Sequence, residues 1–221
     1  MDYESLLYKY NFGDIDIHHL NIDDYKNDYG NCIEQLLKNI KDYDYDTYKH
    51  SVRVGLLSLD IANQIGCDKD IQTEVYFGGL VHDIGKIFIP KNILNKPSKL
   101  TSEEFNIIKT HTILGAGYTF DILPHSILRI IRDHHEKLDG SGYLRQIDKQ
   151  DINMQTRIVS IADMIDGYSS ARTYHAEKSH AETMKFISEQ DGLDNLIVKE
   201  LLGSTTFHFK VLQNNEKMKG A

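Results

Sequence analysis

The chain has 221 residues, of which 40% are hydrophobic and 26% charged, and this length allows one sizeable core. The formal net charge is −8 with histidine counted as neutral. An acidic chain lacks the electrostatic attraction for phosphates that general nucleic-acid binding requires, and we therefore expect no DNA partner. A ligand that carries phosphate would need a local source of positive charge, such as bound metal ions.

The N-terminus, MDYESLLYKYNFGDIDIHHL, has neither a basic start nor an apolar stretch of signal-peptide length. No run approaches the roughly 20 apolar residues that are needed to span a bilayer. The two cysteines, Cys32 and Cys67, form neither a CxxC pair nor a zinc-like spacing. We therefore expect a cytoplasmic protein without a membrane partner.

Apolar residues recur at helical spacing along most of the chain and no strand-like alternation persists, which predicts an all-α fold. Residues 1–40 are polar, and we interpret them as a short N-terminal helical extension. Residues 88–100 contain two prolines and predict a loop; Thr101 and Glu104 then predict a capping box that opens a helix containing Leu114. Further helices are predicted at 47–65, 69–83, 126–136, 154–168, 180–189 and 194–202, before a polar tail at 211–221.

Histidine and aspartate recur on the apolar helices. His82 and Asp83 stand side by side, and imidazole nitrogen and carboxylate oxygen are donors that divalent cations accept. Taken alone, such a pair is more often a surface pair or the capped end of a helix. Here several apolar helices each carry such residues, and buried polar groups are costly unless something satisfies them. A shared metal centre would satisfy all of them, namely His50, His82, Asp83, His111, His134, His135 and Asp163.

Asp46 lies four residues before His50, which places both on one face of a helix, one turn apart. It could add a ligand to a further ion. The alternative interpretation is a solvated acidic residue in the first turn of the helix.

Five motifs follow one another along the chain: His50, HDIGK at 82–86, KTH at 109–111, HHEKLDGSGY at 134–143 and ADMID at 162–166. Their order and spacing resemble the HD-GYP subgroup of the HD-domain metal-dependent phosphohydrolases, over about residues 42–202. The resemblance implies an HD-domain helical bundle at 41–210 and a metal centre usually of iron or manganese. It also implies hydrolysis of cyclic di-GMP, and some members act on cyclic GMP-AMP.

The resemblance implies roles for the metal-binding residues. Matched position by position, the seven histidines and aspartates named above are the ligands, and Asp83 bridges two ions. Members with three metals carry Glu where this chain has Asp46. Two or three divalent ions are therefore expected.

The substrate side matches in part. The residues implied there are Lys86, Gly142, Tyr143, Arg172 and Asp166, with Lys86 beside the scissile phosphate and catalytic together with Asp83, and Asp166 in a supporting position. A planar guanidinium such as that of Arg172 suits phosphate binding. Two positions depart from the motif, because Leu144 replaces its proline and His175 stands where a basic residue is usual. Both departures concern substrate binding more than the metal centre.

The implied function is a metal-dependent phosphodiesterase in which two ions share a hydroxide that attacks phosphorus in line. One alternative is an HD phosphohydrolase for another nucleotide, against which the DGSGY element argues. The other is a non-catalytic module that binds a nucleotide or a partner protein, against which the nearly complete ligand set argues. With no recognisable sensory domain, we expect regulation through a homodimer or a partner, for which the resemblance suggests a diguanylate cyclase.

Overall fold

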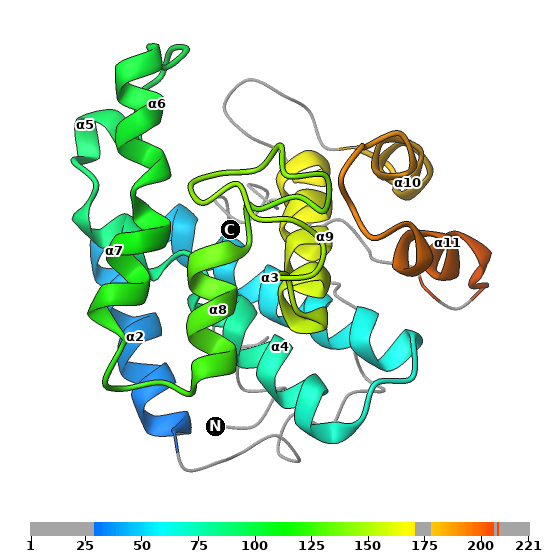
Figure 1. Cartoon of the computed structure of the whole chain (residues 1–221). Helices are drawn as coiled ribbons and strands as arrows, with labels where there is room; N and C mark the ends of the chain where they lie inside the picture. Colours follow the sequence, from blue (N-terminus) through cyan, green and yellow to red (C-terminus); the bar gives the residue numbers. More distant parts are fainter. Residues whose placement is uncertain (1–28, 171–177, 206, 208–221) are drawn as a thin grey trace, which may run out of the picture.

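The computed structural model describes residues 29–170, 178–205 and 207 (Figure 1). Within these ranges the chain forms helices and no strand, which confirms the predicted all-α class. None of the helices in this part of the chain is long and apolar enough to cross a membrane. The helices are α2 Gly30–Tyr43, α3 Tyr45–Gln64, α4 Lys69–Val81, η2 Ile84–Phe88 (a 3₁₀ helix), α5 Lys91–Leu94, α6 Ser102–Lys109, α7 His111–Tyr118, α8 His125–Asp133, α9 Met154–Ser169, α10 His180–Ser188 and α11 Asn195–Gly203.

Helix α3 is the centre of the bundle, between α4 and α9 (Figure 1). It starts at Asp44, whose side chain accepts a hydrogen bond from the Thr47 amide at 2.8 Å and thereby caps the helix. Its apolar residues belong to two buried clusters. One contains Val52 and Leu59 with residues of α2, α4 and α8, and the other contains Ile61 with residues of α9, α10 and α11. Helix α3 is therefore covered on two sides, which places His50 in the interior.

Helix α2 lies partly within the predicted N-terminal extension. Ile33, Leu36 and Ile40 are buried in the same core cluster as α3 and α4. The predicted boundary at residue 40 falls inside this helix. The described part of the extension is thus a packed helix of the bundle, and residues 1–28 and 211–221 lie outside the described residues.

The helix ends differ from the prediction at three places that matter for the site. The helix predicted at 69–83 ends at Val81, and the helix predicted at 126–136 ends at Asp133, so both pairs of predicted ligands follow a helix instead of lying inside it. The helix predicted from Thr101 is capped as expected but divides into α6 and α7 at Thr110. The Thr110 hydroxyl donates to the carbonyl of Ile107 at 2.6 Å, a local bond that competes with a continuous helix.

Candidate metal centre

All seven residues predicted as ligands come together between the helices. They fall into three overlapping groups whose donor atoms lie within 4.8 Å of one another. His50 comes from α3 and Asp163 from α9, whereas the other five lie at or just beyond helix ends. The three groups are His111, His134 and His135; His50, His82 and Asp83; and His82, His134 and Asp163.

Backbone carbonyls fix the proton on three of these histidines. Nδ1 of His82 lies 2.7 Å from the carbonyl oxygen of Gly79, and Nδ1 of His111 lies 2.7 Å from that of Ile108. Nδ1 of His134 lies 3.1 Å from the carbonyl oxygen of Ile131. Because a carbonyl oxygen only accepts hydrogen bonds, Nδ1 must be the donor in each ring. In the neutral imidazole, Nε2 is then left with an unprotonated lone pair.

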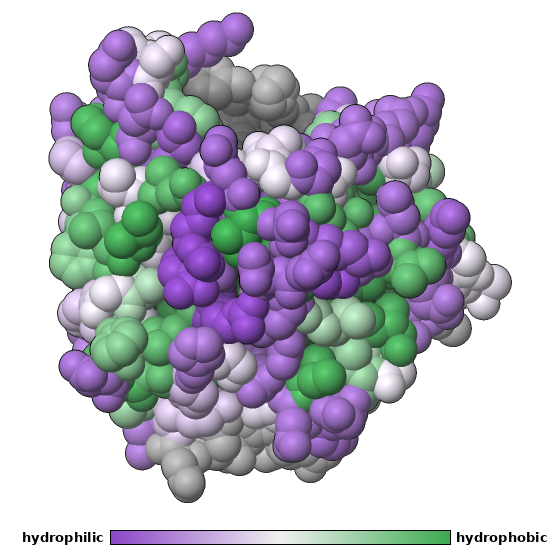
Figure 2. All heavy atoms as spheres, in the orientation of Figure 1, coloured by the Kyte–Doolittle hydropathy of each residue, from purple (hydrophilic) through white to green (hydrophobic). Residues whose placement is uncertain are grey.

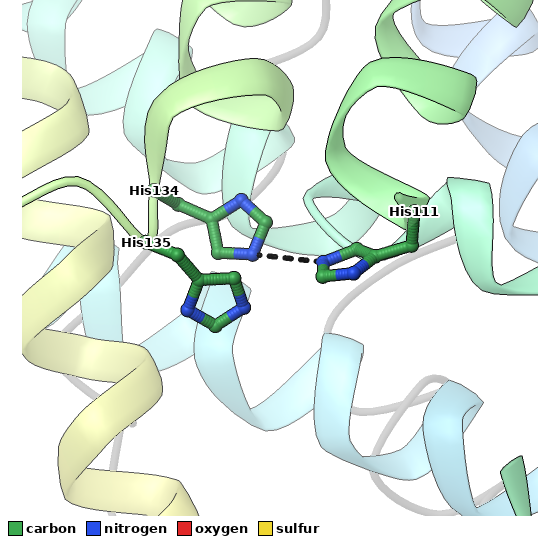
Figure 3. Close-up of side chains that lie close together, drawn as sticks. All are labelled: His111, His134 and His135. Atoms are coloured by element: carbon green, nitrogen blue, oxygen red, sulfur yellow. Dashed lines mark hydrogen bonds between the residues drawn. The ribbon is translucent and has the colours of Figure 1, made fainter. Parts of the chain in front are cut away.

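These lone pairs point at one another. Figure 3 shows His134 and His135 at the end of α8 facing His111 at the start of α7. The Nε2 atoms of His111 and His134 are 3.3 Å apart, too close for two lone pairs without a cation or a proton to share. Nε2 of His82 is buried and makes no hydrogen bond to any described residue, although Asp83 Oδ2 lies 3.3 Å away. An orphaned buried nitrogen and facing imidazoles fit a divalent metal ion.

Burial keeps three of the rings neutral, as metal coordination requires. It lowers the pKa of His111 to about 4 and that of His135 to about 3. Burial and the neighbouring His135 also hold the pKa of His134 well below its usual value. Asp83 is buried too, but Lys86 and His82 outweigh that burial and hold the pKa of its carboxyl well below its usual range. The centre therefore combines neutral imidazoles with an ionised carboxylate.

Asp166, which the resemblance placed in a supporting position, contacts the ring of His50. Its Oδ2 lies 2.7 Å from Nδ1 of His50, so Nε2 of that ring points to Asp163 Oδ1 at 3.0 Å. Burial opposes the charged ring, but the hydrogen bonds with Asp163 and Asp166 outweigh it and raise the pKa of His50 to about 9. Asp166 also accepts two hydrogen bonds from Arg53, at 2.5 and 2.9 Å.

Arg53 was missed by the sequence reasoning. The available signal was a repeated spacing, since Arg53 follows His50 by three residues and Asp166 follows Asp163 by three. Residues three apart lie on one face of a helix. Two such pairs on packed helices can therefore form one hydrogen-bonded group.

Asp46 does not join the cluster. Its side chain is 85% exposed and forms an ion pair with Lys49 at 2.8 Å. This placement agrees with the alternative interpretation of a solvated acidic residue in the first turn of α3.

The predicted substrate-side residues lie beside the ligands where the structure describes them. Nζ of Lys86 is 2.5 Å from Asp83 Oδ2. The Tyr143 ring stacks on His135 with centroids 4.6 Å apart. Arg172 and His175 lie outside the described residues, and Leu144 is half-buried next to Tyr143.

A short turn places Tyr143 against His135. A Cβ atom on Gly142 would lie 2.4 Å from Glu136 Cα and 2.6 Å from the His135 carbonyl oxygen, so this approach requires glycine. The amide of Tyr143 donates to that same carbonyl at 3.2 Å. The buried carboxylate of Glu136 accepts from the amide of Arg145 at 2.6 Å and so holds the far side of the turn.

Comparison with known proteins places this geometry in a family. The family described as HD domain matches residues 34–196. The chain belongs to the HD-domain family. Relatives include a cyclic di-GMP phosphodiesterase from Thermotoga maritima, 39% identical over 72% of this chain and 44% of that protein. A 3'3'-cGAMP-specific phosphodiesterase from Vibrio cholerae is 34% identical over 72% of this chain and 37% of that protein. The HD-domain chain thus spans less than half of these relatives.

Solved structures show the same fold. An HDG"Y"P protein from Bdellovibrio bacteriovorus aligns with a TM-score of 0.59 and 21% identity over 78% of this HD-domain chain and 61% of that one. The HD domain of the L. monocytogenes phosphodiesterase PgpH, in complex with cyclic-di-AMP, aligns with a TM-score of 0.58 and 21% identity, covering 75% of this chain and 91% of that one. The predicted HD-GYP-type bundle is confirmed.

Proposed function

We propose that this HD-domain protein is a metal-dependent phosphodiesterase that hydrolyses a cyclic dinucleotide, with cyclic di-GMP as the favoured substrate. The observation that carries the proposal is the convergence of unprotonated imidazole nitrogens from His82, His111 and His134 next to Asp83. The relatives from Thermotoga maritima and Vibrio cholerae are named as phosphodiesterases of cyclic di-GMP and of 3'3'-cGAMP. Both compounds are therefore candidate substrates.

The proposed ligands are the seven clustered residues, and iron or manganese is the proposed metal. Bound divalent ions would supply Lewis-acid activation of water and of the phosphoryl group. The donor set of imidazole nitrogen and carboxylate oxygen suits such ions. With Asp46 turned to solvent, these seven residues provide for two ions more readily than for three.

The chain's own residues have defined tasks in this proposal. Lys86 would donate a hydrogen bond to a non-bridging phosphate oxygen, because its ammonium lies at Asp83 on the border of the cluster. Asp166 and Arg53 would keep His50 in the ring orientation that ligation needs. Tyr143, stacked on His135, would shield that ligand from bulk water and border the substrate.

Two other functions keep some support. A non-catalytic module that binds a nucleotide or a partner protein would agree with Leu144 and His175, which depart from the motif on the substrate side. An HD phosphohydrolase for another nucleotide would share the whole ligand set. The DGSGY turn, which places Tyr143 on His135, favours the cyclic-dinucleotide enzyme over the HD phosphohydrolase of another nucleotide. The nearly complete set of proposed ligands favours it over the non-catalytic module.

The deciding experiment is turnover by protein that has been loaded anaerobically with Fe(II) or Mn(II). Cyclic di-GMP and cyclic GMP-AMP are supplied separately, and products are followed by chromatography. His82→Ala and Asp83→Ala remove two proposed ligands, and His125→Ala removes an exposed histidine outside the cluster as a matched control. We expect turnover in the wild type and in His125→Ala and none in the two ligand variants.

Three outcomes would contradict the proposal. A wild-type protein with full metal content that binds cyclic di-GMP without hydrolysing it is a binding module. A protein that hydrolyses neither dinucleotide but cleaves another nucleotide ester is an HD phosphohydrolase of a different substrate class. Turnover that survives in Asp83→Ala would place the reaction outside this cluster.

Partners and location belong to the same proposal. We place the activity in the cytoplasm, with a homodimer or a diguanylate cyclase as the regulatory partner. Light scattering of the purified chain tests the homodimer, and co-purification with a cyclase tests the second partner.

A further inference from the structure

Helix α6 stands away from the bundle and buries none of its residues (Figure 1). A short helix without burial is marginal unless local interactions hold it. Here the capping box of Thr101 and Glu104 closes its N-terminus, and Lys96 pairs with Glu104 at 2.6 Å. The protein thus maintains an exposed helix directly before the proposed ligand His111, which starts α7.

One face of α6 is turned toward the metal centre. Phe105 and Lys109 are four residues apart, so their side chains lie on the same face. The Phe105 ring meets the Tyr143 ring edge to face, with centroids 6.1 Å apart. Nζ of Lys109 lies over both rings, 5.3 Å from the centroid of Phe105 and 5.9 Å from that of Tyr143. Since Tyr143 stacks on His135, these side chains continue outward from the metal centre.

Both side chains are available to a ligand. Phe105 is 45% exposed, so its ring can be reached by a ligand from solvent. Lys109 forms no ion pair with any described carboxylate, whereas Lys86 pairs with Asp83 and Lys96 pairs with Glu104. An uncompensated ammonium next to an exposed ring suits an anion that carries an aromatic group.

The chemistry of a cyclic dinucleotide calls for such a place. It carries two phosphodiester groups on opposite sides of its ring, and each is linked to nucleosides with flat bases. When one phosphodiester lies at the metal centre, the second negative charge and a base extend beyond it. In a chain of net charge −8, a local cation outside the metal centre is needed for that second charge.

We propose that the Phe105–Lys109 face of α6 is the subsite for the half of the dinucleotide that is not being cleaved. A purine base stacks on Phe105, and the Lys109 ammonium contacts the second phosphodiester. This inference rests on the proposed function for its ligand. It assigns to α6 a role in affinity for the dinucleotide and none in metal binding.

The test compares two probes in equilibrium binding to the metal-loaded protein. Cyclic di-GMP can reach both the metal centre and α6, whereas inorganic phosphate can reach only the metal centre. Phe105→Ala and Lys109→Met remove the two proposed contacts. Ile107→Ala is the matched control, because Ile107 is exposed on the same helix about 200° around from Phe105.

We expect Phe105→Ala and Lys109→Met each to lower the affinity for cyclic di-GMP about tenfold, because base stacking and phosphate contacts usually contribute that much to binding. Phosphate affinity, metal content and the thermal midpoint stay at wild-type values, and Ile107→Ala matches the wild type throughout. If turnover is present, KM rises by the same factor and kcat stays within about twofold.

An unchanged cyclic di-GMP affinity in either variant overturns the contact assigned to that residue, while the proposed function stands if turnover persists. An equal loss of phosphate and cyclic di-GMP binding shows that the residue supports the metal centre and overturns the subsite. A wild type that binds cyclic di-GMP through α6 without hydrolysing it supports the subsite and refutes the enzyme. No binding of cyclic di-GMP by the wild type overturns both.

Discussion

Asp166 carries two tasks with one carboxylate, because it accepts hydrogen bonds from His50 and from Arg53. Asp166→Asn keeps the shape but removes the charge, so the amide no longer holds both partners. We expect a metal affinity about 10–100-fold lower, which is the usual effect of removing a group that orients a ligand. The measurement is competition against a chelating dye.

Asp194→Asn is the matched control for that experiment. Asp194 is also a buried carboxylate, paired with Arg157 at 3.0 Å, but it caps α11 and lies outside the metal cluster. It should lower stability and leave metal affinity unchanged. Equal metal affinity in the two variants would remove Asp166 from the metal-binding group.

The charge of Lys86 should matter for the rate of the reaction, as the charge of Asp166 should matter for metal affinity. Lys86→Met keeps the length of the side chain and removes the ammonium beside Asp83. We expect kcat for cyclic di-GMP to fall about 100–1000-fold, as when one stabilising donor is removed from a transition state. Metal content should stay at the wild-type value. Lys38→Met, which removes an exposed lysine paired with Asp42 on α2, serves as control; a similar kcat in both variants would exclude Lys86 from the reaction.

The sequence brought candidate residues of the site together where residue type and position both carried information. Burying histidine and aspartate on apolar helices costs free energy unless a hydrogen bond or a metal ion satisfies them. The seven candidates do come together in the structure. The approach missed Arg53, since a lone arginine on a helix is usually solvated and only its facing carboxylate reveals its task. It could not decide Asp46, because both interpretations place it on the same turn and only the packing shows that it is 85% exposed.

At the scale of elements, the contact between η2 and α7 depends on two glycines. A Cβ atom on Gly85 would lie 1.9 Å from the carbonyl oxygen of His111 and 2.6 Å from the amide nitrogen of Gly115. Both obstacles are backbone atoms, so α7 would have to move as a unit. This contact holds Nε2 of His111 3.2 Å from Asp83 Oδ1.

Gly85→Ala should therefore separate His111 from Asp83. We expect a stability loss of about 1–3 kcal/mol, as for an overpacked core, together with a lower metal stoichiometry. Chemical denaturation and metal analysis measure the two effects. Gly117→Ala is the control, because Gly117 lies on α7 and a Cβ atom there would have nothing within 4 Å. This substitution should be neutral or stabilise the fold by up to about 1 kcal/mol. Full metal content in Gly85→Ala would show that the two elements can separate without loss of the site.

Element ends were the weakest part of the sequence prediction, and five of the seven proposed ligands lie at or just beyond them. Apolar periodicity continues through Val81 into His82 and through Ile131 into His134, so it gives no signal that the helix has ended. In the structure both ligand pairs follow the last helical turn. Their Nδ1 atoms bond to carbonyls of that turn, which would otherwise lack a partner. The same bonds turn the Nε2 atoms toward the centre.

At the scale of the molecule, the proposed metal centre lies where two apolar clusters meet. One cluster joins residues of α2, α4 and α8, the other joins residues of α9, α10 and α11, and α3, α4 and α8 contribute to both. The seven proposed ligands come from segments between residues 50 and 163, far apart in sequence. Bound metal would therefore link both halves of the core, and its removal should affect the whole bundle rather than one loop.

This arrangement predicts a metal-dependent thermal midpoint. A chelator leaves the lone pairs of His111 and His134 facing each other at 3.3 Å and the buried carboxylates without their cations. Restoring metal at about 100 times its Kd should stabilise the native state by about 2.7 kcal/mol. For a domain of this size, that corresponds to a rise of roughly 5–11 °C in Tm. Differential scanning calorimetry of the chelated and reloaded protein measures it.

Two variants make the thermal experiment specific to the cluster. His82→Ala should lack the metal-dependent rise, because it removes the ligand whose Nε2 has no other hydrogen bond among the described residues. His125→Ala, which removes an exposed histidine, should keep it. A midpoint that stays constant while the chelator strips the metal would mean that the ions bind outside the core. The coupling of the two apolar clusters through the metal would then be wrong, even if the enzyme were active.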